Sequence, residues 1–235
     1  NKTGGVGLVK TILIDLDETL LDFSRAEACA LERALRESGA PYSEEIRQRY
    51  HAINGEQWEL LEDGVLTREQ ALVRRFERLF AELGLEGLDA GINDRYESYL
   101  EDGRWLLPGA LELLKILAPK YRLYAASNGG GTVQNRRLEG AGIREYFQGV
   151  FISEEVGFDK PSAEFFSACF ARIPDFRKEE AVMIGDSLTS DIRGGRNAGL
   201  RTCWFNPRRL EPRPDIQPDF QVFALEDIPA LLETL

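Results

Sequence analysis

The stretch TILIDLDETLL, from Thr11 to Leu21, joins the pattern of a buried strand to two closely spaced acids. Its branched apolar residues, Ile12 to Ile14, are typical of a strand that is covered on both faces. Asp15 and Asp17 follow at once, with a single leucine between them. Because a protein interior strongly disfavours unpaired carboxylates, we expect other groups to stabilise both acids where this strand ends.

Composition is that of an ordinary globular protein and limits the partners of the chain. Its 235 residues are enough for one large domain or for a core domain with a smaller one, and 43% are hydrophobic and 29% charged. The formal net charge of −11 argues against a nucleic-acid polymer as partner, because polyanion binding needs a basic face. A small phosphate ester stays compatible with this charge, since one local site can oppose the global field.

Three features predict a cytoplasmic protein. No apolar run approaches the roughly 20 residues that span a bilayer, so we expect no membrane partner. Residues 1–10, NKTGGVGLVK, lack the apolar centre of a signal peptide. The three cysteines, Cys29, Cys169 and Cys203, are odd in number and far apart, which is typical of free thiols in a reducing compartment.

Residues 24–101 carry apolar side chains at helical spacing and no strand pattern. Thr67, with Gln70 three residues later, is typical of a capped helix start, and Gly84 is typical of a helix end. Three further helices are expected from Ser24 to Gly39, near Ser43–Leu61 and near Asp89–Leu100. This segment therefore predicts a bundle of about four helices.

After Pro108 the pattern changes to strands that alternate with helices. The expected strands cover residues 121–127, 149–153, 181–187, 201–205 and 220–223, and residues 9–16 belong with them by composition. Alternation of this kind predicts right-handed βαβ units and a parallel sheet. We therefore expect an α/β fold: a Rossmann-like parallel-sheet core of residues 1–22 and 104–235, with an inserted helical-bundle domain of residues 23–103.

Polar residues follow the carboxyl ends of several expected strands, where open parallel sheets bind their ligands. They are Asp15, Asp17, Thr19, Ser127, Asn128, Lys160, Asp186 and Asp191. Two like charges ~4 Å apart repel by about 4 kcal/mol at an effective dielectric near 20, and one lysine does not neutralise four acids. Mg²⁺, with Mn²⁺ as the alternative, prefers such carboxylates together with water and a phosphate. The sequence thus predicts a divalent metal and a phosphate ester at this edge.

Such a site suits phosphoryl transfer. One carboxylate can attack phosphorus in line and form an acyl phosphate, while a second, two residues on, can protonate the leaving oxygen and later activate water. The metal and Lys160 would neutralise the charge that gathers on oxygen. The hydroxyls of Thr19 and Ser127, with backbone N–H groups near Asn128 and the glycines after it, can hold the phosphoryl oxygens.

Four segments in this order resemble the haloacid dehalogenase superfamily of phosphatases, over essentially the whole chain. They are DLDET (Asp15–Thr19), SN (Ser127–Asn128), DKP (Asp159–Pro161) and GDSLTSD (Gly185–Asp191), each after an expected strand. The first motif alone is short and weak evidence, but all four in register make a chance match very improbable.

The resemblance implies a role for each matching position. Asp15 corresponds to the nucleophile, Asp17 to the general acid/base, and Lys160 to the lysine that orients nucleophile and phosphate. The metal ligands would be Asp15, Asp186 and the main-chain carbonyl of Asp17, with Asp191 as an acidic partner behind them or bound through water. Phosphate would be held by Thr19, Ser127, Asn128 and Lys160, and the helical insertion corresponds to a cap that covers the site.

The sequence around two of the motifs is similar to that of the pyrimidine 5′-nucleotidases of this superfamily, which are thought to clear non-canonical nucleotides. The segments are GFDKPSAEFF (157–166) and IGDSLTSDIRGGRNAGLRTCWFNP (184–207). This likeness implies a nucleoside 5′-monophosphate, with a pyrimidine preferred. In the insertion, Phe23 or Trp58 can stack on a base and Asn54 can pair with its polar edge. The insertion contains no lysine between residues 24 and 101, which disfavours a substrate with a second phosphate.

Other classes fit less well. No G-x-G-x-x-G follows the first strand and no G-x-x-x-x-G-K-[ST] occurs, against a dinucleotide oxidoreductase and a P-loop enzyme. A dehalogenase needs no acid at Asp17, and a phosphonate hydrolase needs a lysine in the insertion. A sugar-phosphate phosphatase or phosphomutase of the same superfamily stays open, as does a catalytically silent binding protein on this fold. We expect a small phosphorylated metabolite as partner and a monomer or homodimer as the assembly.

Overall fold

The computed structural model describes residues 8–85 and 91–235, and the chain divides into two compact units. One unit is formed by Asn1–Asp22 together with Leu106–Leu235, and the other by Phe23–Trp105. We call them the α/β unit and the helical unit. The second boundary falls after Trp105, whereas the sequence suggested residue 103. The expected lack of a signal peptide rests on residues 1–10, most of which lie outside the described part.

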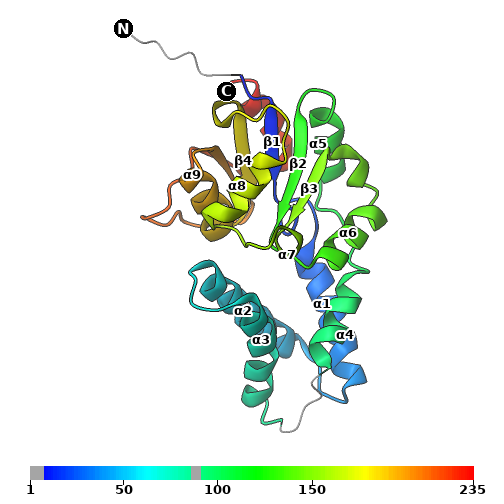
Figure 1. Cartoon of the computed structure of the whole chain (residues 1–235). Coiled ribbons are helices and arrows are strands. Elements are labelled where there is room, and N and C mark those ends of the chain that lie inside the picture. Colours follow the sequence, from blue (N-terminus) through cyan, green and yellow to red (C-terminus); the bar gives the residue numbers. More distant parts are fainter. Residues whose placement is uncertain (1–7, 86–90) are drawn as a thin grey trace. The chain divides into compact units, whose positions relative to one another are not determined.

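In the described part of the chain, six strands form one parallel sheet in the order β3-β2-β1-β4-β5-β6 (Figure 1). Their bounds are β1 Thr11–Ile14, β2 Arg122–Ser127, β3 Gly149–Ile152, β4 Ala181–Gly185, β5 Arg201–Phe205 and β6 Phe220–Val222. The expected α/β fold with a parallel sheet is therefore confirmed. β1 lies between β2 and β4, so the acids that follow it occupy the middle of the carboxyl edge.

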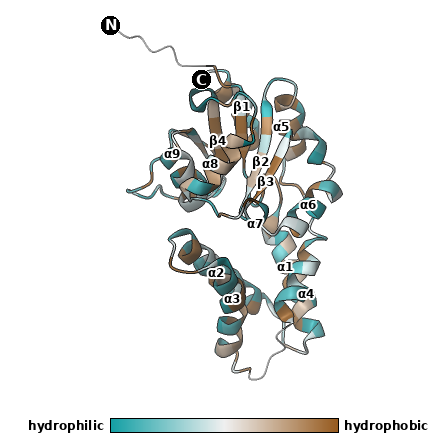
Figure 2. Ribbon diagram, in the orientation of Figure 1, coloured by the Kyte–Doolittle hydropathy of each residue, from teal (hydrophilic) through white to brown (hydrophobic). Residues whose placement is uncertain are grey.

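The sheet is covered on both faces, as the unbroken apolar run in β1 predicts. Ile12 and Ile14 face a cluster that includes Leu113 and Leu114 of α5 (Ala110–Leu117). Leu13 faces the opposite cluster, with the aromatic side chains of α8 (Ala163–Ala171). In Figure 2 the hydrophobic colour is concentrated in β1 and β4, the two strands at the centre of this sandwich.

The remaining helices of the α/β unit follow the strands in turn. They are α6 Gly131–Gly140, α7 Ser153–Val156, α9 Arg193–Asn197 and α10 Ile228–Leu232, with a π-helical turn at Leu188–Ile192 and short 3₁₀ turns at Arg144–Tyr146, Lys178–Glu180 and Leu225–Asp227. The π-helical turn and α9 replace the single helix expected over residues 188–199. No helix in the described residues is long and apolar enough to cross a membrane.

β1 ends at Ile14, earlier than the expected Leu16, because the chain folds into a tight loop there. The carbonyl of Leu16 accepts hydrogen bonds from the N–H groups of Leu20 and Leu21, both at 2.8 Å. Glu18 has a φ of 58°, a left-handed conformation that is uncommon for a residue other than glycine. This loop places Asp15 and Asp17 directly after β1, at the carboxyl edge of the sheet.

In residues 23–85 and 91–105, the helical unit forms four helices: α1 Phe23–Glu37, α2 Glu44–Glu62, α3 Arg68–Glu82 and α4 Ile92–Leu100. The capping box of Thr67 and Gln70 is present as predicted. α1 begins at Phe23, one residue before the expected start at Ser24. The expected helix start at Asp89 lies outside the described residues. The rings of Tyr50, Phe76 and Tyr96 pack together inside the unit.

Candidate active site

Three acids from two strand ends and a following turn meet at the carboxyl edge of the sheet. Asp15 follows β1, Asp186 follows β4, and Asp191 lies in the π-helical turn. Their carboxylates each offer an oxygen, and these oxygens lie within 4.8 Å of one another. The backbone N–H of Asp15 also donates to the carbonyl of Ile184 at 2.9 Å, which ties the loop after β1 to β4. Three of the four acids that the sequence predicted at this edge are thus brought together.

Lys160 lies at the centre of this cluster and is 1% exposed. Its Nζ donates to Asp15 Oδ1 at 2.7 Å, to Asp191 Oδ1 at 2.6 Å and to the carbonyl of Ala126 at 2.7 Å. All three hydrogens of the ammonium group therefore have acceptors. The predicted proximity of Lys160 to Asp15 is found, and the lysine holds one oxygen of that carboxylate in place.

The charges in this cluster do not balance. Burial, followed by the charge of Asp191, raises the pKa of Asp15 to about 8, although Lys160 acts in the opposite direction. Burial and the charge of Asp15 also raise the pKa of Asp186 well above its usual value. Burial alone would lower the pKa of Lys160, but the two neighbouring carboxylates hold it above the usual range. Clustered carboxylate oxygens with excess negative charge are the donor set that a hard divalent cation prefers.

Asp191 is fixed from both sides. Its Oδ1 accepts from Lys160, its Oδ2 accepts from the backbone N–H of Ser187 at 3.0 Å, and the residue is fully buried. Gly185 leaves the space for it, because a Cβ at this position would lie 2.1 Å from Asp191 Oδ2. Asp191 therefore acts on Lys160 and on the loop after β4, in keeping with the supporting place expected for it.

The side chain of Asn128 bonds to the backbone of Lys160. Its Oδ1 accepts from the backbone N–H of Lys160 at 2.7 Å, and its Nδ2 donates to the backbone carbonyl of Lys160 at 2.8 Å. The Asn128 amide therefore bonds to both the N–H and the C=O group of Lys160, and these two bonds fix the position of the lysine backbone. Phosphate binding by Asn128 stays a prediction for its backbone N–H group alone.

Thr19 is likewise used inside the protein and is fully buried. Its hydroxyl lies 3.3 Å from Asp186 Oδ1 and 3.4 Å from Asp15 Oδ2, and accepts from the backbone N–H of Asp186 at 3.1 Å. A hydroxyl has one hydrogen to donate, and both nearby acceptors are protein carboxylates. The position of Thr19 supports a role in joining the two acidic loops and weighs against the expected phosphate contact.

Asp17 is held by two residues that the sequence did not single out. Arg137 Nη1 donates to Asp17 Oδ1 at 2.5 Å, and Gln134 Nε2 donates to Asp17 Oδ2 at 2.8 Å. Gln134 Nε2 also lies 2.7 Å from Ser127 Oγ. Both residues belong to α6, the helix after the SN motif. One pattern in the sequence could have indicated them: Gln134 and Arg137 are three residues apart, between the apolar Val133 and Leu138, and this spacing places both polar groups on the buried face of a helix.

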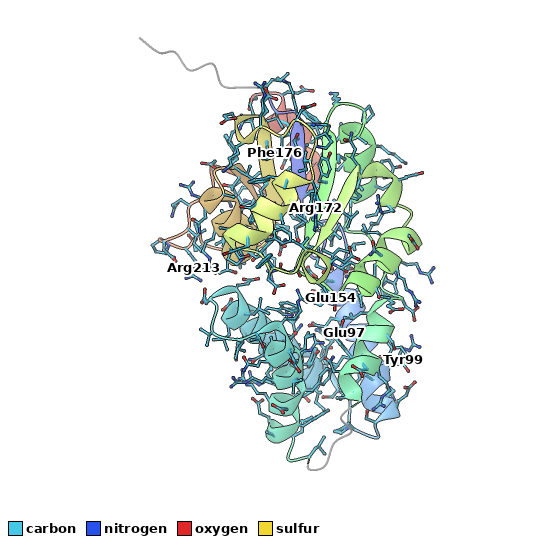
Figure 3. The ribbon with its side chains drawn as sticks, viewed as in Figure 1. Glu97, Tyr99, Glu154, Arg172, Phe176 and Arg213 are labelled. Atoms are coloured by element: carbon cyan, nitrogen blue, oxygen red, sulfur yellow. The ribbon has the colours of Figure 1, made fainter. Side chains whose placement is uncertain are left out.

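The glycine loop after Asn128 has a partly occupied backbone. The N–H of Gly131 donates to Glu154 Oε2 at 2.5 Å, so this donor already has a carboxylate partner (Glu154 is labelled in Figure 3). Gly130 precedes α6 and has an extended conformation. In this conformation of the loop, the N–H group of Gly131 is therefore not free to bind phosphate, although this was expected of these glycines.

The substrate residues proposed in the helical unit differ in what they offer. Asn54 is 3% exposed, its Nδ2 donates to Glu27 Oε1 at 2.9 Å, and its Oδ1 lies 3.4 Å from Arg75 Nη1. Both ends of its amide are thus used within the unit, which weighs against base pairing. Phe23 begins α1, and it is partly exposed.

Trp58 is partly buried against Leu61 and Leu66, and the guanidinium of Arg68 lies 5.4 Å from the centre of its ring. It packs in a small cluster of its own at the end of α2. Stacking of Phe23 or Trp58 on a base stays a prediction.

Comparison with known proteins identifies the family. Residues 9–199 match the model of the haloacid dehalogenase-like hydrolases. The chain therefore belongs to this family of hydrolases, and the resemblance inferred from its four motifs is confirmed.

Individual relatives cover nearly the whole chain. It is 40% identical over 220 residues to the pyrimidine 5′-nucleotidase PynA of Streptococcus pneumoniae, with 93% of each protein covered. It is 33% identical to the pyrimidine 5′-nucleotidase YjjG of Escherichia coli, over 94% of this chain and 96% of the relative. The crystal structure of the HAD-hydrolase YfnB from Bacillus subtilis, bound to magnesium, matches with a TM-score of 0.92 at 38% identity, over 96% of this chain and 99% of the other.

Proposed function

We propose that the protein is a Mg²⁺-dependent phosphate monoester hydrolase that acts on nucleoside 5′-monophosphates and prefers pyrimidines. The observation that carries the proposal is the acidic cluster of Asp15, Asp186 and Asp191 around Lys160, with its oxygens within 4.8 Å of one another. A catalytically silent binding protein has no need of a buried acid cluster whose charges are left unbalanced.

The metal is proposed from the donor set and from one relative. YfnB was crystallised with magnesium, and burial together with the neighbouring aspartates raises the pKa values of Asp15 and Asp186, which supports a cation as the missing partner. These two carboxylates, with the main-chain carbonyl of Asp17, would hold Mg²⁺. The ion would stabilise negative charge on the phosphoryl oxygens. Mn²⁺ uses the same kind of ligand and is the alternative.

The chemistry assigned to the chain needs two carboxylates in different roles. Asp15 attacks phosphorus in line, a bond forms between its carboxylate oxygen and phosphorus, and the bond to the ester oxygen breaks. Asp17 donates a proton to that leaving oxygen and then takes one from the water that attacks the aspartyl phosphate. Inorganic phosphate leaves and Asp15 is restored. Lys160 neutralises part of the charge on nucleophile and phosphate throughout.

The substrate class rests on the relatives and on the helical unit. PynA and YjjG are pyrimidine 5′-nucleotidases, and the insertion contains no lysine that would favour a second phosphate. We assign selection of the leaving group to this unit, with Phe23 and Trp58 as stacking candidates. Asn54 is the weakest of the three proposals, because its amide is already engaged.

The test compares kcat/KM for UMP, dUMP and dTMP with the values for AMP, GMP and several sugar phosphates. We expect the pyrimidine nucleotides to give the highest values. If a sugar phosphate or a purine nucleotide has a kcat/KM more than tenfold higher than the pyrimidine nucleotides, the assignment as a pyrimidine nucleotidase is refuted. A phosphatase or phosphomutase of another specificity then remains.

We place the protein in the cytoplasm, as a monomer or homodimer. The three free thiols, Cys29, Cys169 and Cys203, support a reducing compartment. Sedimentation of the purified protein tests the assembly.

A further inference from the structure

Four hydrogen bonds connect the side chains of Asp17, Ser127, Gln134 and Arg137. Arg137 Nη1 donates to Asp17 Oδ1 at 2.5 Å and to Gln134 Oε1 at 2.8 Å. Gln134 Nε2 donates to Asp17 Oδ2 at 2.8 Å and to Ser127 Oγ at 2.7 Å. Both oxygens of the Asp17 carboxylate therefore accept a bond from α6.

The chemistry of the four groups determines the direction of each bond. A guanidinium only donates and an ionised carboxylate only accepts, so with Asp17 ionised the carbonyl end of the Gln134 amide must face Arg137 and its NH₂ end must face Asp17. The reverse orientation would bring oxygen against oxygen and nitrogen against nitrogen. Because Gln134 donates to Ser127 Oγ, the hydroxyl hydrogen of Ser127 points elsewhere and is available to another acceptor.

The two α6 side chains are much more buried than the group they hold. Gln134 and Arg137 are each 1% exposed, whereas the side chain of Asp17 is 29% exposed. Burial of a guanidinium is unfavourable unless a partner compensates its charge. A partly exposed aspartate without such partners would sample several side-chain orientations, whereas bonds at both oxygens restrict it to one.

The position of Gln134 depends in turn on Gly129. A Cβ added to Gly129 would lie 2.4 Å from Gln134 Cγ and 2.9 Å from its Nε2. The glycine after the SN motif therefore keeps open the space that the Gln134 side chain occupies. This gives a way to displace Gln134 without changing any charge.

We propose that Gln134 and Arg137 are positioning residues that orient Asp17 for proton transfer to the leaving group. Gln134 also couples this orientation to Ser127, which lies beside it. The inference rests on the proposed function, in which Asp17 is the general acid/base. It goes beyond that function by assigning to α6 the task of directing the acid.

The expected effect depends on the leaving group. A nucleoside 5′-oxygen is strongly basic and needs a proton as it departs, whereas p-nitrophenolate leaves without one. The value of kcat/KM covers the steps up to departure of the leaving group, so it isolates this first proton transfer. Misplaced acid catalysis should therefore lower kcat/KM for UMP and affect p-nitrophenyl phosphate much less.

The primary variant is Arg137→Met, which keeps most of the buried stem and removes the guanidinium. We expect kcat/KM to fall about 10²-fold for UMP, the lower range for loss of general acid catalysis, and less than about tenfold for p-nitrophenyl phosphate. Arg137→Lys keeps the charge and should recover part of the loss. Arg136→Met, at the exposed neighbour on the same helix, is the matched control and should change neither substrate.

A second variant reaches the same network without touching Arg137. Gly129→Ala should push Gln134 away and produce the same selective loss for UMP, smaller than that of Arg137→Met. In a Gln134→Ala background the space is free, so Gly129→Ala should then cost little more. Gly55→Ala, where the added Cβ meets nothing within 4 Å, is the control for a glycine substitution.

A double-mutant cycle separates positioning from a general structural role. If Arg137 acts through Asp17, Arg137→Met should cause no further loss for UMP in an Asp17→Asn background. Equal losses for both substrates, or fully additive losses in the cycle, would overturn the inference and leave the proposed function intact. A wild-type protein that hydrolyses neither ester would overturn the proposed function, and the inference with it.

Discussion

The two units of this protein each bury a cluster of charged side chains, but the clusters differ in balance. In the helical unit, Arg75 is 2% exposed and donates to Glu97 at 2.5 Å and to Asn93 at 2.7 Å (Glu97 is labelled in Figure 3). Nearby, Glu27 is 1% exposed and accepts from Asn54 and pairs with His51. Each buried charge in this unit has a protein partner of opposite or polar character.

In the α/β unit, the acidic cluster contains three carboxylates and one buried ammonium group. Asp15, Asp186 and Asp191 lie together, and Lys160 forms ion pairs with two of them, Asp15 and Asp191. Burial, followed by the charge of Asp191, raises the pKa of Asp15, although Lys160 acts in the opposite direction. The contrast teaches that burial of charge alone does not indicate function, whereas a buried excess of one sign indicates a missing ligand of the other sign.

The largest expected effect comes from the nucleophile. Asp15→Asn keeps the shape of the side chain and removes the attacking charge, so turnover should fall at least ~10³-fold, or about 4 kcal/mol in barrier lowering. The same change removes one like charge from the acidic cluster, so the metal-free variant should be no less stable to heat than the wild type. Steady-state rates and thermal unfolding check the two parts. Near-normal turnover of this variant would contradict the covalent mechanism.

In the helical unit, we expect a substitution in the charged cluster to lower stability and to leave hydrolysis nearly unchanged. Arg75→Met leaves Glu97 without its buried partner, and breaking such a pair from one side typically costs about 3–5 kcal/mol. Denaturant unfolding should show a loss of this order. Hydrolysis of p-nitrophenyl phosphate by the protein that remains folded should change little, because Arg75 bonds to Asn54, Asn93 and Glu97, which all belong to the helical unit. Arg74→Met, at the exposed neighbour, is the control. A stability loss no larger than that of the control would show that this cluster is not a structural one.

The smallest expected effect concerns selection of the base. Trp58→Ala should raise KM for UMP by about tenfold, because stacking on a nucleobase contributes roughly 1–3 kcal/mol. A phosphate ester without a base should be hydrolysed as before. Asn54→Ala should instead lower stability, since it leaves Glu27 and Arg75 short of a partner. If Asn54→Ala raises KM for UMP and leaves stability unchanged, Asn54 binds the base and the roles given to Trp58 and Asn54 are wrong.

The fold and the acidic residues could be predicted from the sequence because they depend on local patterns. The run Ile12–Ile14 indicates a strand covered on both faces, and parallel strands bring Asp15 and Asp186 to one edge whatever the details of packing. The capped start at Thr67 is equally local, since cap and partner lie three residues apart. Such features need no knowledge of side-chain direction.

The partners of these residues could not be predicted in the same way. Whether Asn128 turns toward a ligand or toward the backbone of Lys160 depends on the course of a loop 32 positions later in the sequence. Thr19 was expected to hold phosphate because it follows the first strand and matches the hydroxyl of the first motif, yet it is buried and its hydroxyl lies beside Asp186. Gln134 and Arg137 reach Asp17 across well over one hundred residues of sequence, which no spacing rule anticipates.

The most direct test of the central claim is a Mg²⁺ titration of the chelator-treated enzyme. Protein that has been freed of metal with EDTA is assayed against UMP and p-nitrophenyl phosphate while Mg²⁺ is added, for the wild type and for Asp186→Asn. The imbalance of the acidic cluster predicts no hydrolysis of either ester without the ion, full and saturable recovery in the wild type, and recovery only at much higher Mg²⁺, or none, in Asp186→Asn. Full activity after exhaustive chelation would contradict the claim that this cluster is completed by a divalent cation.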